Sequence, residues 1–203
     1  QTFGGTGDKI EGIAQKTSVI TEINNIKNGL KLAAKSGNIG TGTSADTSKD
    51  LLGLAELAYF PEQINSQVTN EGGTARTSGY NNYYAISFGG EESTPANSAM
   101  RISLVAPQSG IVPGIYVEFQ AAGSLSSNAG FLETQIANDL KDIAYIDRTS
   151  TSVPTSLTAR TATTATTLDK RLPTAPATQS NLNDGKFIIY FNDFGSDEVV
   201  VAD

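Results

Sequence analysis

The sequence of 203 residues contains no cysteine, no histidine and no tryptophan, and Met100 is its only methionine. Without histidine and cysteine, the usual zinc, copper, haem and thiolate sites lose their ligands. The most common general base near neutral pH is missing too. Because no pattern gathers the remaining carboxylate, lysine and tyrosine side chains into a recognisable motif, we predict a protein without catalytic residues, cofactor or bound metal.

Basic residues are also few. The 14 Lys and Arg residues are outnumbered by 21 Asp and Glu residues, which gives a net charge of −7. Such a surface does not neutralise phosphate groups, so nucleic acid and anionic lipid are poor candidate partners. The sequence has no apolar run of about 20 residues that could span a bilayer, and no recognisable targeting peptide.

The residues that are abundant are Gly, Ala, Ser, Thr and Asn, a composition typical of external filament and surface-layer subunits. Hydrophobic residues make up 38% of the chain and charged residues 17%, which suits a globular protein. A length of 203 residues is enough for one large hydrophobic core and favours one core over two separate ones. We therefore predict a single domain over residues 1–203 that works outside the cell.

The strongest structural signal is a long amphipathic helix predicted over residues 8–36. Asp8 and Glu11 have the spacing of a capping box at its start, and Gly37 suits its C-cap. Its apolar residues form two adjacent strips, Ile13/Ile20/Leu30/Ala34 and Val19/Ile23/Ile26/Ala33. Both strips could cover one sheet, or one of them could pack on a neighbouring subunit. The candidate subunit-packing face is Val19, Ile23, Ile26, Leu30 and Ala33.

The remaining pattern predicts a connector, a sheet and two shorter helices. The connector covers residues 37–66 and carries a helix at about 48–59, capped by Thr47 or Ser48. Alternating or β-branched runs at 83–88, 100–105, 115–119, 187–191 and 198–201 predict strands, and an apolar stripe predicts a helix over 129–146. The Thr- and Ser-rich tract 149–168 is a solvated loop, an edge strand or a stalk. We predict an α+β fold in which the long N-terminal helix packs on an antiparallel sheet within residues 80–203, with two further short helices.

Oxygen-bearing side chains near the C-terminus form a weak calcium candidate. Asn181, Asn183 and Asp184 lie close in sequence to Asp193, Asp197 and Glu198, and calcium prefers oxygen ligands. The same Asn- and Asp-rich segments are ordinary turn sequences, and the EF-hand spacing is missing. We keep Asp193 and Asp197 as weak candidates and favour turns.

Three other segments have a functional and a structural interpretation. The carboxylates Glu91, Glu92, Asp139 and Asp142 could serve acid–base chemistry, but the last two share a helix face that points to water. The apolar loop 110–114 could dock on a partner, although an inward-facing hairpin turn is favoured. Tyr80, Tyr83 and Tyr84 could stack on a sugar ring, although cross-strand aromatic pairs are favoured.

The order of these elements resembles that of a type IV pilin of the type IVb kind. In that family the amphipathic back half of a long helix, here residues 8–36, lies on an antiparallel sheet, here 83–88, 100–105, 115–119 and 187–191. The family's apolar N-terminal half-helix is not in this sequence, so the resemblance implies a soluble domain lacking it. Many members close a C-terminal loop with a disulfide. This chain has no cysteine, so pairing by residues 187–191, or a calcium ion near Asp193, would hold that loop instead.

The resemblance implies an extracellular structural subunit of a pilus or pseudopilus filament on a bacterial surface. Its partners would be copies of itself and the pilus assembly machinery, reached through the missing half-helix. The alternatives are a secreted adhesin that recognises sugars with its loops, and a surface-layer, flagellin-like or phage-tail structural protein. Flagellins need long helices at both chain ends, whereas strands are predicted at this C-terminus.

Overall fold

The long helix is the first element of the computed structural model, which describes residues 2–40, 50–70, 82–85, 88, 99–105, 107–120, 125–161 and 169–202. It is α1 (Thr2–Lys35), which begins earlier than predicted and ends one residue sooner. Gly37 has a φ of +72°. Its amide donates to Ala34 O at 3.0 Å and the next amide, of Asn38, to Ala33 O at 2.8 Å. These two bonds form a Schellman motif, so the predicted glycine C-cap is confirmed.

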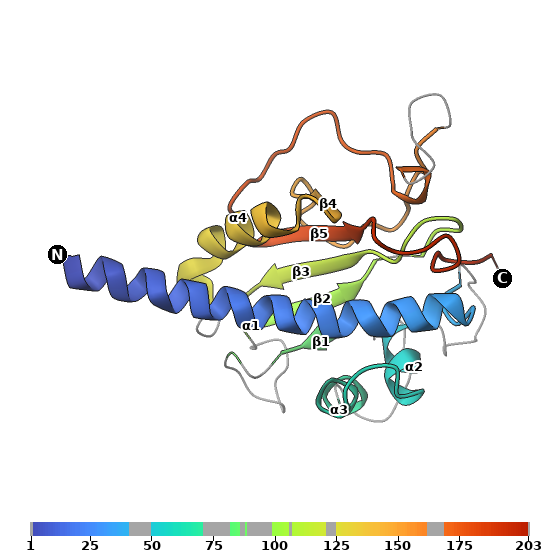
Figure 1. Ribbon diagram of the computed structural model, residues 1–203, viewed down its shortest axis with the longest axis horizontal. Coiled ribbons are helices and arrows are strands. Elements are labelled where there is room, and N and C mark those ends of the chain that lie inside the picture. The colour runs from blue at the N-terminus through green and yellow to red at the C-terminus, as the bar shows by residue number, and fades with distance from the viewer. Residues whose placement is uncertain are drawn as a thin grey trace.

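The described strands form a five-stranded sheet in the order β1-β2-β3-β5-β4, and every neighbouring pair is antiparallel. They are β1 (Asn82–Tyr84), β2 (Met100–Leu104), β3 (Ile115–Phe119), β4 (Ala144–Asp147) and β5 (Lys186–Phe191). The last strand along the chain therefore lies inside the sheet, between β3 and β4. Figure 1 shows α1 running across one face of this sheet, which confirms the predicted α+β fold.

Register separates a core face from a far face of the sheet. Ile102 pairs with Val117, which pairs with Phe187, and all three are fully buried on the side of α1. Their neighbours along each strand point to the opposite face. That far face carries polar and aromatic residues, among them Tyr116 and Tyr190. The irregular segment 148–161 lies over it, because Tyr116 Oη donates to Thr151 O at 3.2 Å.

The apolar face assigned to subunit contacts is used within the chain. Each of its five residues is 0% exposed in the core between α1 and the sheet: Val19, Ile23, Ile26, Leu30 and Ala33. A side chain that its own domain covers completely is not accessible to a neighbour. The assignment of this face to a neighbouring subunit is therefore wrong, and the face serves the sheet.

The connector holds two helices where one was predicted. α2 (Leu51–Glu56) is shorter than predicted and is capped by Asp50, whose Oδ1 accepts the Gly53 amide at 2.7 Å. The predicted caps Thr47 and Ser48 lie outside the described residues. α3 (Glu62–Asn70), which was not predicted, begins just after Pro61. Pro is favoured at helix starts, since its missing amide hydrogen needs no partner there.

Two predictions in the second half of the chain are wrong, one about where a helix ends and one about a strand. α4 (Ala129–Leu140), preceded by the short 3-10 helix η4 (Ser126–Asn128), ends six residues before the predicted end at 146, and β4 takes up the remainder. Residues 198–201, all described, form no strand beyond a single bridge between Val201 and Gly40. The 110–114 loop is the predicted inward turn, because Ile111 and Val112 are buried.

The described part of the Thr- and Ser-rich tract, residues 149–161, is largely irregular and solvent-exposed. It turns back on the segment after η5 (Asp169–Arg171) through one bridge between Ala159 and Pro173. The Thr174 amide donates to Thr158 O at 2.6 Å beside this bridge. The described part of the tract is therefore a loop, held at its start by Asp147 and Tyr116 and at its end by this bridge. Residues 162–168 of the tract lie outside the described part of the chain.

Candidate functional site

The side of α1 that faces away from the sheet is exposed and carries almost no charge. Apart from Glu11 at its edge, the exposed residues between positions 10 and 32 are all uncharged. We call them the outer stripe: Ile10, Ile13, Ala14, Thr17, Ser18, Thr21, Asn28 and Leu32. Ile10, Ile13 and Leu32 are 62%, 45% and 58% exposed. Large apolar side chains at both ends thus flank a middle section of small residues.

The threonines of the outer stripe direct their hydroxyls to their own helix. Thr17 Oγ1 donates to Ile13 O at 3.1 Å, and Thr21 Oγ1 donates to Thr17 O at 2.9 Å. This i to i−4 bonding is an alternative to hydrogen bonding with water. Because these hydroxyl donors already have partners, burying this part of the stripe would leave neither of them unsatisfied.

Lysines in the second half of α1 contact the rest of the domain. Three lysines spaced four residues apart pair with the segment after β5: Lys27 with Asp193 at 3.2 Å, Lys31 with Glu198 at 3.8 Å and Lys35 with Asp197 at 3.8 Å. Lys27 Nζ also lies 4.7 Å from the centre of the Phe191 ring, within reach of a cation–π contact. This lysine row fixes the C-terminal segment to α1.

The same pairs bear on the calcium candidates. Asp193 and Asp197 each face a lysine ammonium group, which competes with a bound cation for the carboxylate. Among the residues that the structure describes, no three His, Cys, Asp or Glu side chains are grouped so that they could hold a metal ion. The two aspartates therefore act as anchors for the lysine row.

The opposite flank of α1 carries one half-buried acid. Tyr83 Oη donates to Glu22 Oε2 at 3.1 Å. Burial raises the pKa of Glu22 above its ordinary value of 4.5, and the bond from Tyr83 offsets part of this rise. Burial and the Glu22 charge raise the pKa of Tyr83 as well.

Because Tyr83 is fully buried, it cannot stack on a sugar. Its cross-strand partner is Ile102, and that of Tyr84 is Arg101, so the predicted aromatic pairs are not formed there either. Tyr80 lies outside the described residues, as do the carboxylates Glu91 and Glu92.

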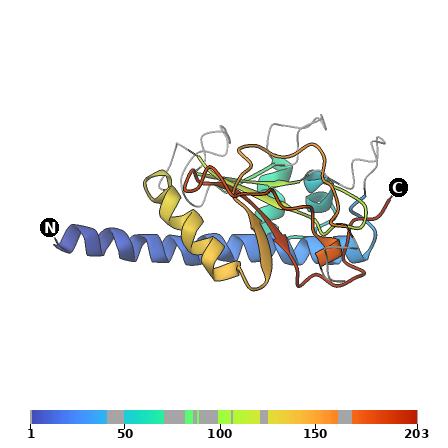
Figure 2. The same cartoon turned by 90° about the horizontal axis from the view of Figure 1, so that it is seen from above.

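The front of α1 extends past the sheet, as Figures 1 and 2 show. The contacts to α4 begin at Gly12, where a Cβ atom would lie 2.8 Å from the Phe131 ring. They continue with an ion pair of 2.9 Å between Lys16 and Asp139. This pair places Asp139 in a surface contact, and Asp142 is exposed, so the predicted surface position of both carboxylates is confirmed.

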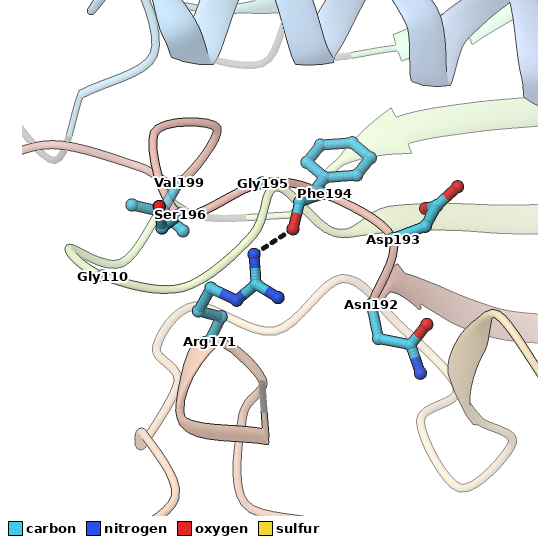
Figure 3. Close-up of a pocket in the computed structure, with 8 residues that line it drawn as sticks. All are labelled: Gly110, Arg171, Asn192, Asp193, Phe194, Gly195, Ser196 and Val199. Carbon is cyan, nitrogen blue, oxygen red and sulfur yellow. Dashed lines mark hydrogen bonds between the residues drawn. The ribbon is translucent and has the colours of Figure 1, made fainter. Parts of the chain in front are cut away.

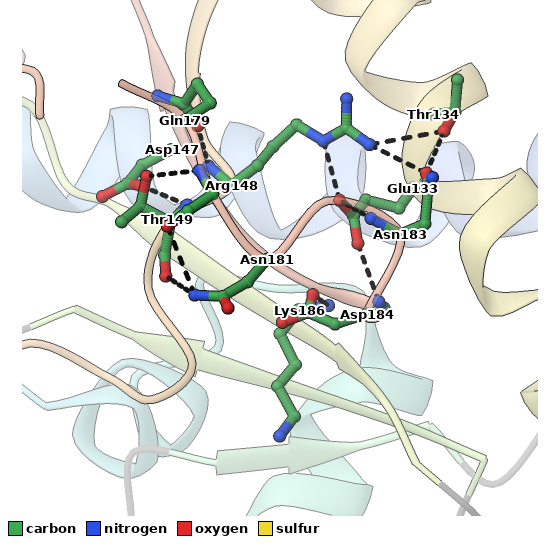
Figure 4. A network of polar contacts seen from close by, with 12 residues as sticks. Glu133, Thr134, Asp147, Arg148, Thr149, Gln179, Asn181, Asn183, Asp184 and Lys186 are labelled. Carbon is green, nitrogen blue, oxygen red and sulfur yellow. Dashed lines mark hydrogen bonds and ion pairs between the residues drawn. The ribbon is translucent and has the colours of Figure 1, made fainter. Parts of the chain in front are cut away.

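A buried polar cluster, which sequence reasoning missed, ties α4 to the segment before β5 (Figure 4). Glu133 is fully buried, and its Oε2 accepts Arg148 Nε at 2.7 Å and the Asn183 amide at 2.9 Å. Its Oε1 accepts the Gly185 amide at 2.7 Å. We call these four residues the Glu133 clamp. Both carboxylate oxygens are occupied by structural donors, so the clamp fixes the loop and offers no free acid or base.

The loop that the clamp fixes is a turn, as its Asn-rich sequence indicated. Asn181, Asn183 and Gly185 have φ values of 56°, 67° and 78°, a left-handed conformation that Asn and Gly tolerate best. The Asp184 carboxylate accepts the Lys186 amide at 2.9 Å. Burial raises the pKa of Asp184. The clamp, the lysine row and the central position of β5 together hold the C-terminal region of a chain that has no disulfide.

A recess of about 770 Å³ lies where the 110 turn, η5 and the segment after β5 meet (Figure 3). Arg171 donates a hydrogen bond to Phe194 O across it. Its lining also includes Asn192, Asp193 and Ser196. Asp193 is engaged by Lys27, so this recess contains no carboxylate free to act as a base for Ser196.

The chain matches no known protein-family model, and no curated protein or solved structure matches it either. Of the helices that the structure describes, none combines the length and the apolar character needed to cross a bilayer. The outer stripe is therefore the candidate functional surface on the strength of its own geometry.

Proposed function

We propose that this chain is a non-catalytic structural subunit of an extracellular, type IV pilus-like filament on a bacterial surface. In this proposal the outer stripe of α1 packs against neighbouring copies, while the sheet and its loops face outward. The observation that carries the proposal is the combination, on one exposed helix face, of large apolar side chains with threonines that already bond to their own helix.

The charge distribution on α1 supports this role. Lys27 and Lys31 are half-buried against carboxylates of the same chain, so α1 keeps these charges on a flank, and the exposed Lys35 lies beyond the end of the outer stripe. Burying an unpaired charge between subunits would cost several kcal/mol, and a stripe without charge avoids this cost. Small residues in the middle of the stripe allow two helices to approach closely, since their backbones meet no long side chains.

The front of α1 supports a filament rather than an isolated dimer. Its first turns extend past the sheet, where helices of several neighbours can reach them (Figure 2). In the proposed assembly an apolar half-helix continues α1 into the filament core and engages the membrane-bound assembly machinery. The other partners are further copies of the chain.

The absence of cysteine from the 203-residue sequence allows a direct test by labelling. A single Thr21→Cys substitution places a thiol on the outer stripe, and Thr155→Cys places one on the exposed loop over the far face. In cells that produce the protein, we expect maleimide to label Thr155→Cys in both assembled and dissociated material. Thr21→Cys should react only after the filaments are dissociated.

Equal labelling of the two positions in assembled material would show that the outer stripe remains open and would refute the proposed packing. Failure to find the protein in any surface filament would refute the filament itself. Leu32→Glu provides a second measurement. In the filament the new charge would be buried between subunits, so the yield of filaments should fall. The isolated chain should stay folded, because Leu32 is exposed there.

A further inference from the structure

A second recess, of about 440 Å³, lies on the far face of the sheet under the Thr- and Ser-rich loop. Its volume falls in the range of about 300–1,000 Å³ that is typical of small-molecule sites. Asp147 at the end of β4 and Tyr190 of β5 form its base. The walls carry hydroxyl groups and apolar rings: Thr149, Ser156, Thr158, Thr174, Pro154 and Pro176.

Tyr190 is the residue that points to a ligand. Its side chain is only 1% exposed, and its ring stacks on Tyr145 with a centroid distance of 6.0 Å. Its hydroxyl forms no hydrogen bond with any residue that the structure describes and is not fully buried, so it can bond to a group in the recess. Burial, assisted by the nearby Asp147 charge, raises the pKa of Tyr190, so the phenol stays protonated and able to donate.

Asp147 supplies fixed acceptors beside this donor. Its Oδ1 accepts the Thr149 amide at 2.8 Å and its Oδ2 accepts Ser150 Oγ at 3.2 Å, which fixes the carboxylate plane (Figure 4 shows the first of these bonds). Each carboxylate oxygen can accept a further hydrogen bond. The recess therefore offers a rigid acceptor and an unused donor next to the hydroxyls of Ser156 and Thr158, whereas Thr149 and Thr174 already donate to Thr178 O and Ala159 O.

The charge around the recess favours a neutral ligand. The guanidinium group of Arg160 lies 5.0 Å from the centre of the Tyr145 ring, and its Nε donates to Pro173 O at 2.9 Å. Arg160 does not line the recess, and it and Asp147 shift the pKa of Tyr145 in opposite directions. Asp147 is the one charged residue among the described residues that line the recess, so a neutral ligand is favoured over an anionic one.

We propose that this recess binds a neutral pyranoside, that is, a saccharide unit of a glycan. Such a ligand has hydroxyls that can pair with Tyr190, Asp147 and the wall hydroxyls, and C–H faces that can pack on proline rings. The site is independent of the outer stripe and lies on the opposite side of the sheet. A filament subunit with this site would also recognise glycans.

The test is saturation-transfer NMR on the 203-residue chain with the methyl pyranosides of glucose, galactose, mannose and N-acetylglucosamine. For ligands of this size, typical efficiencies predict a dissociation constant on the order of 1 mM. We expect saturation transfer to at least one pyranoside. Tyr190→Phe removes only the hydroxyl and should weaken binding about three- to tenfold, the effect of one neutral hydrogen bond.

Two further variants keep the result interpretable. Ser156→Trp fills the recess from an exposed position and should abolish saturation transfer. Tyr59→Phe removes a hydroxyl at the C-terminal end of α2, remote from the recess, and should leave binding unchanged. Absence of transfer to all four pyranosides, or transfer that persists in Ser156→Trp, overturns the proposal. Binding of a proline-rich peptide without any pyranoside also overturns it. None of these three outcomes affects the labelling test of the outer stripe.

Discussion

Replacing Glu133 by glutamine tests the Glu133 clamp with a change of almost no volume. The native carboxylate accepts two hydrogen bonds at Oε2 and one at Oε1. A glutamine that keeps its carbonyl toward Arg148 and Asn183 directs its NH2 group at the Gly185 amide. Two donors then face each other in a fully buried site, and one backbone N–H is left without an acceptor.

The expected loss of stability can be worked from these three bonds. An unsatisfied buried amide costs about 1–3 kcal/mol, and each of the other two bonds loses about 1 kcal/mol when its acceptor becomes neutral. The sum is about 3–5 kcal/mol, which agrees with the usual cost of removing one partner of a buried ion pair. For a chain of this size, such a loss lowers Tm by about 10 °C.

Urea unfolding followed by far-UV circular dichroism measures this loss, with thermal unfolding as a second readout. The control is Asp139→Asn on the same helix, which removes a partly exposed pair with Lys16 and should cost less than about 1 kcal/mol. If Glu133→Gln unfolds within 1 kcal/mol of the native chain (roughly the control's effect), the clamp does not hold the segment before β5 and the reasoning is refuted.

Three further predictions concern α1 and the tyrosines. Gly29→Ala should destabilise the chain by about 1–3 kcal/mol in urea unfolding, because the new Cβ would overlap the Phe60 ring; a gain of about 1 kcal/mol, as helix propensity alone predicts, would contradict this close packing. Burial raises the pKa of Glu22 above 4.5, so the stability that protonated Glu22 contributes is present below pH 4.5 and is lost as the pH rises through the raised pKa. Glu22→Gln should therefore have a higher Tm than the native chain at pH 7, and the difference should vanish near pH 4. Equal Tm values of the two chains at both pH values would be inconsistent with this burial. Burial raises the pKa of Tyr145 to about 12, so the absorbance of its phenolate near 295 nm should be missing at pH 11 from the folded chain and appear on unfolding, and a Tyr145→Phe variant identifies its share of the signal.

Local sequence signals predicted the elements whose residues carry their own periodicity. The apolar spacing of α1 and the alternation of β2, β3 and β5 mark these segments within one or two residues of their observed ends, except at the front of α1. Gly37 marked the end of the helix, because a left-handed residue is needed at that position. Such signals act over a few residues, so they can be read from the amino-acid sequence alone.

β4 was missed because its sequence continues the stripe of α4. Leu140 and Ile143 have helical spacing, yet Ile143 is 39% exposed and the next four residues pair with β5. The pairing of Tyr145 with Tyr190 joins positions far apart along the chain, and no local pattern reports it. Tertiary pairing therefore overrides the helical signal at this point.

The face of α1 predicted for subunit contacts is buried within the domain, and the proposed contact surface is the opposite face of the same helix. Periodicity identifies residues that will be buried, and Ile23 and Leu30 are buried, but it does not identify what covers them. The outer stripe was overlooked because Thr17 and Thr21 are polar residues by composition, and only the structure shows that their hydroxyls are satisfied within the helix. The Glu133 clamp was missed for a related reason, since its donors come from segments that are distant in sequence.

The central position of β5 determines when this chain can fold. β5 (residues 186–191) pairs with β3 on one side and with β4 on the other. Until it does so, β3 and β4 each expose an unpaired edge. The sheet therefore closes only when residues 186–191 are available to pair, and contacts of such long sequence separation form slowly.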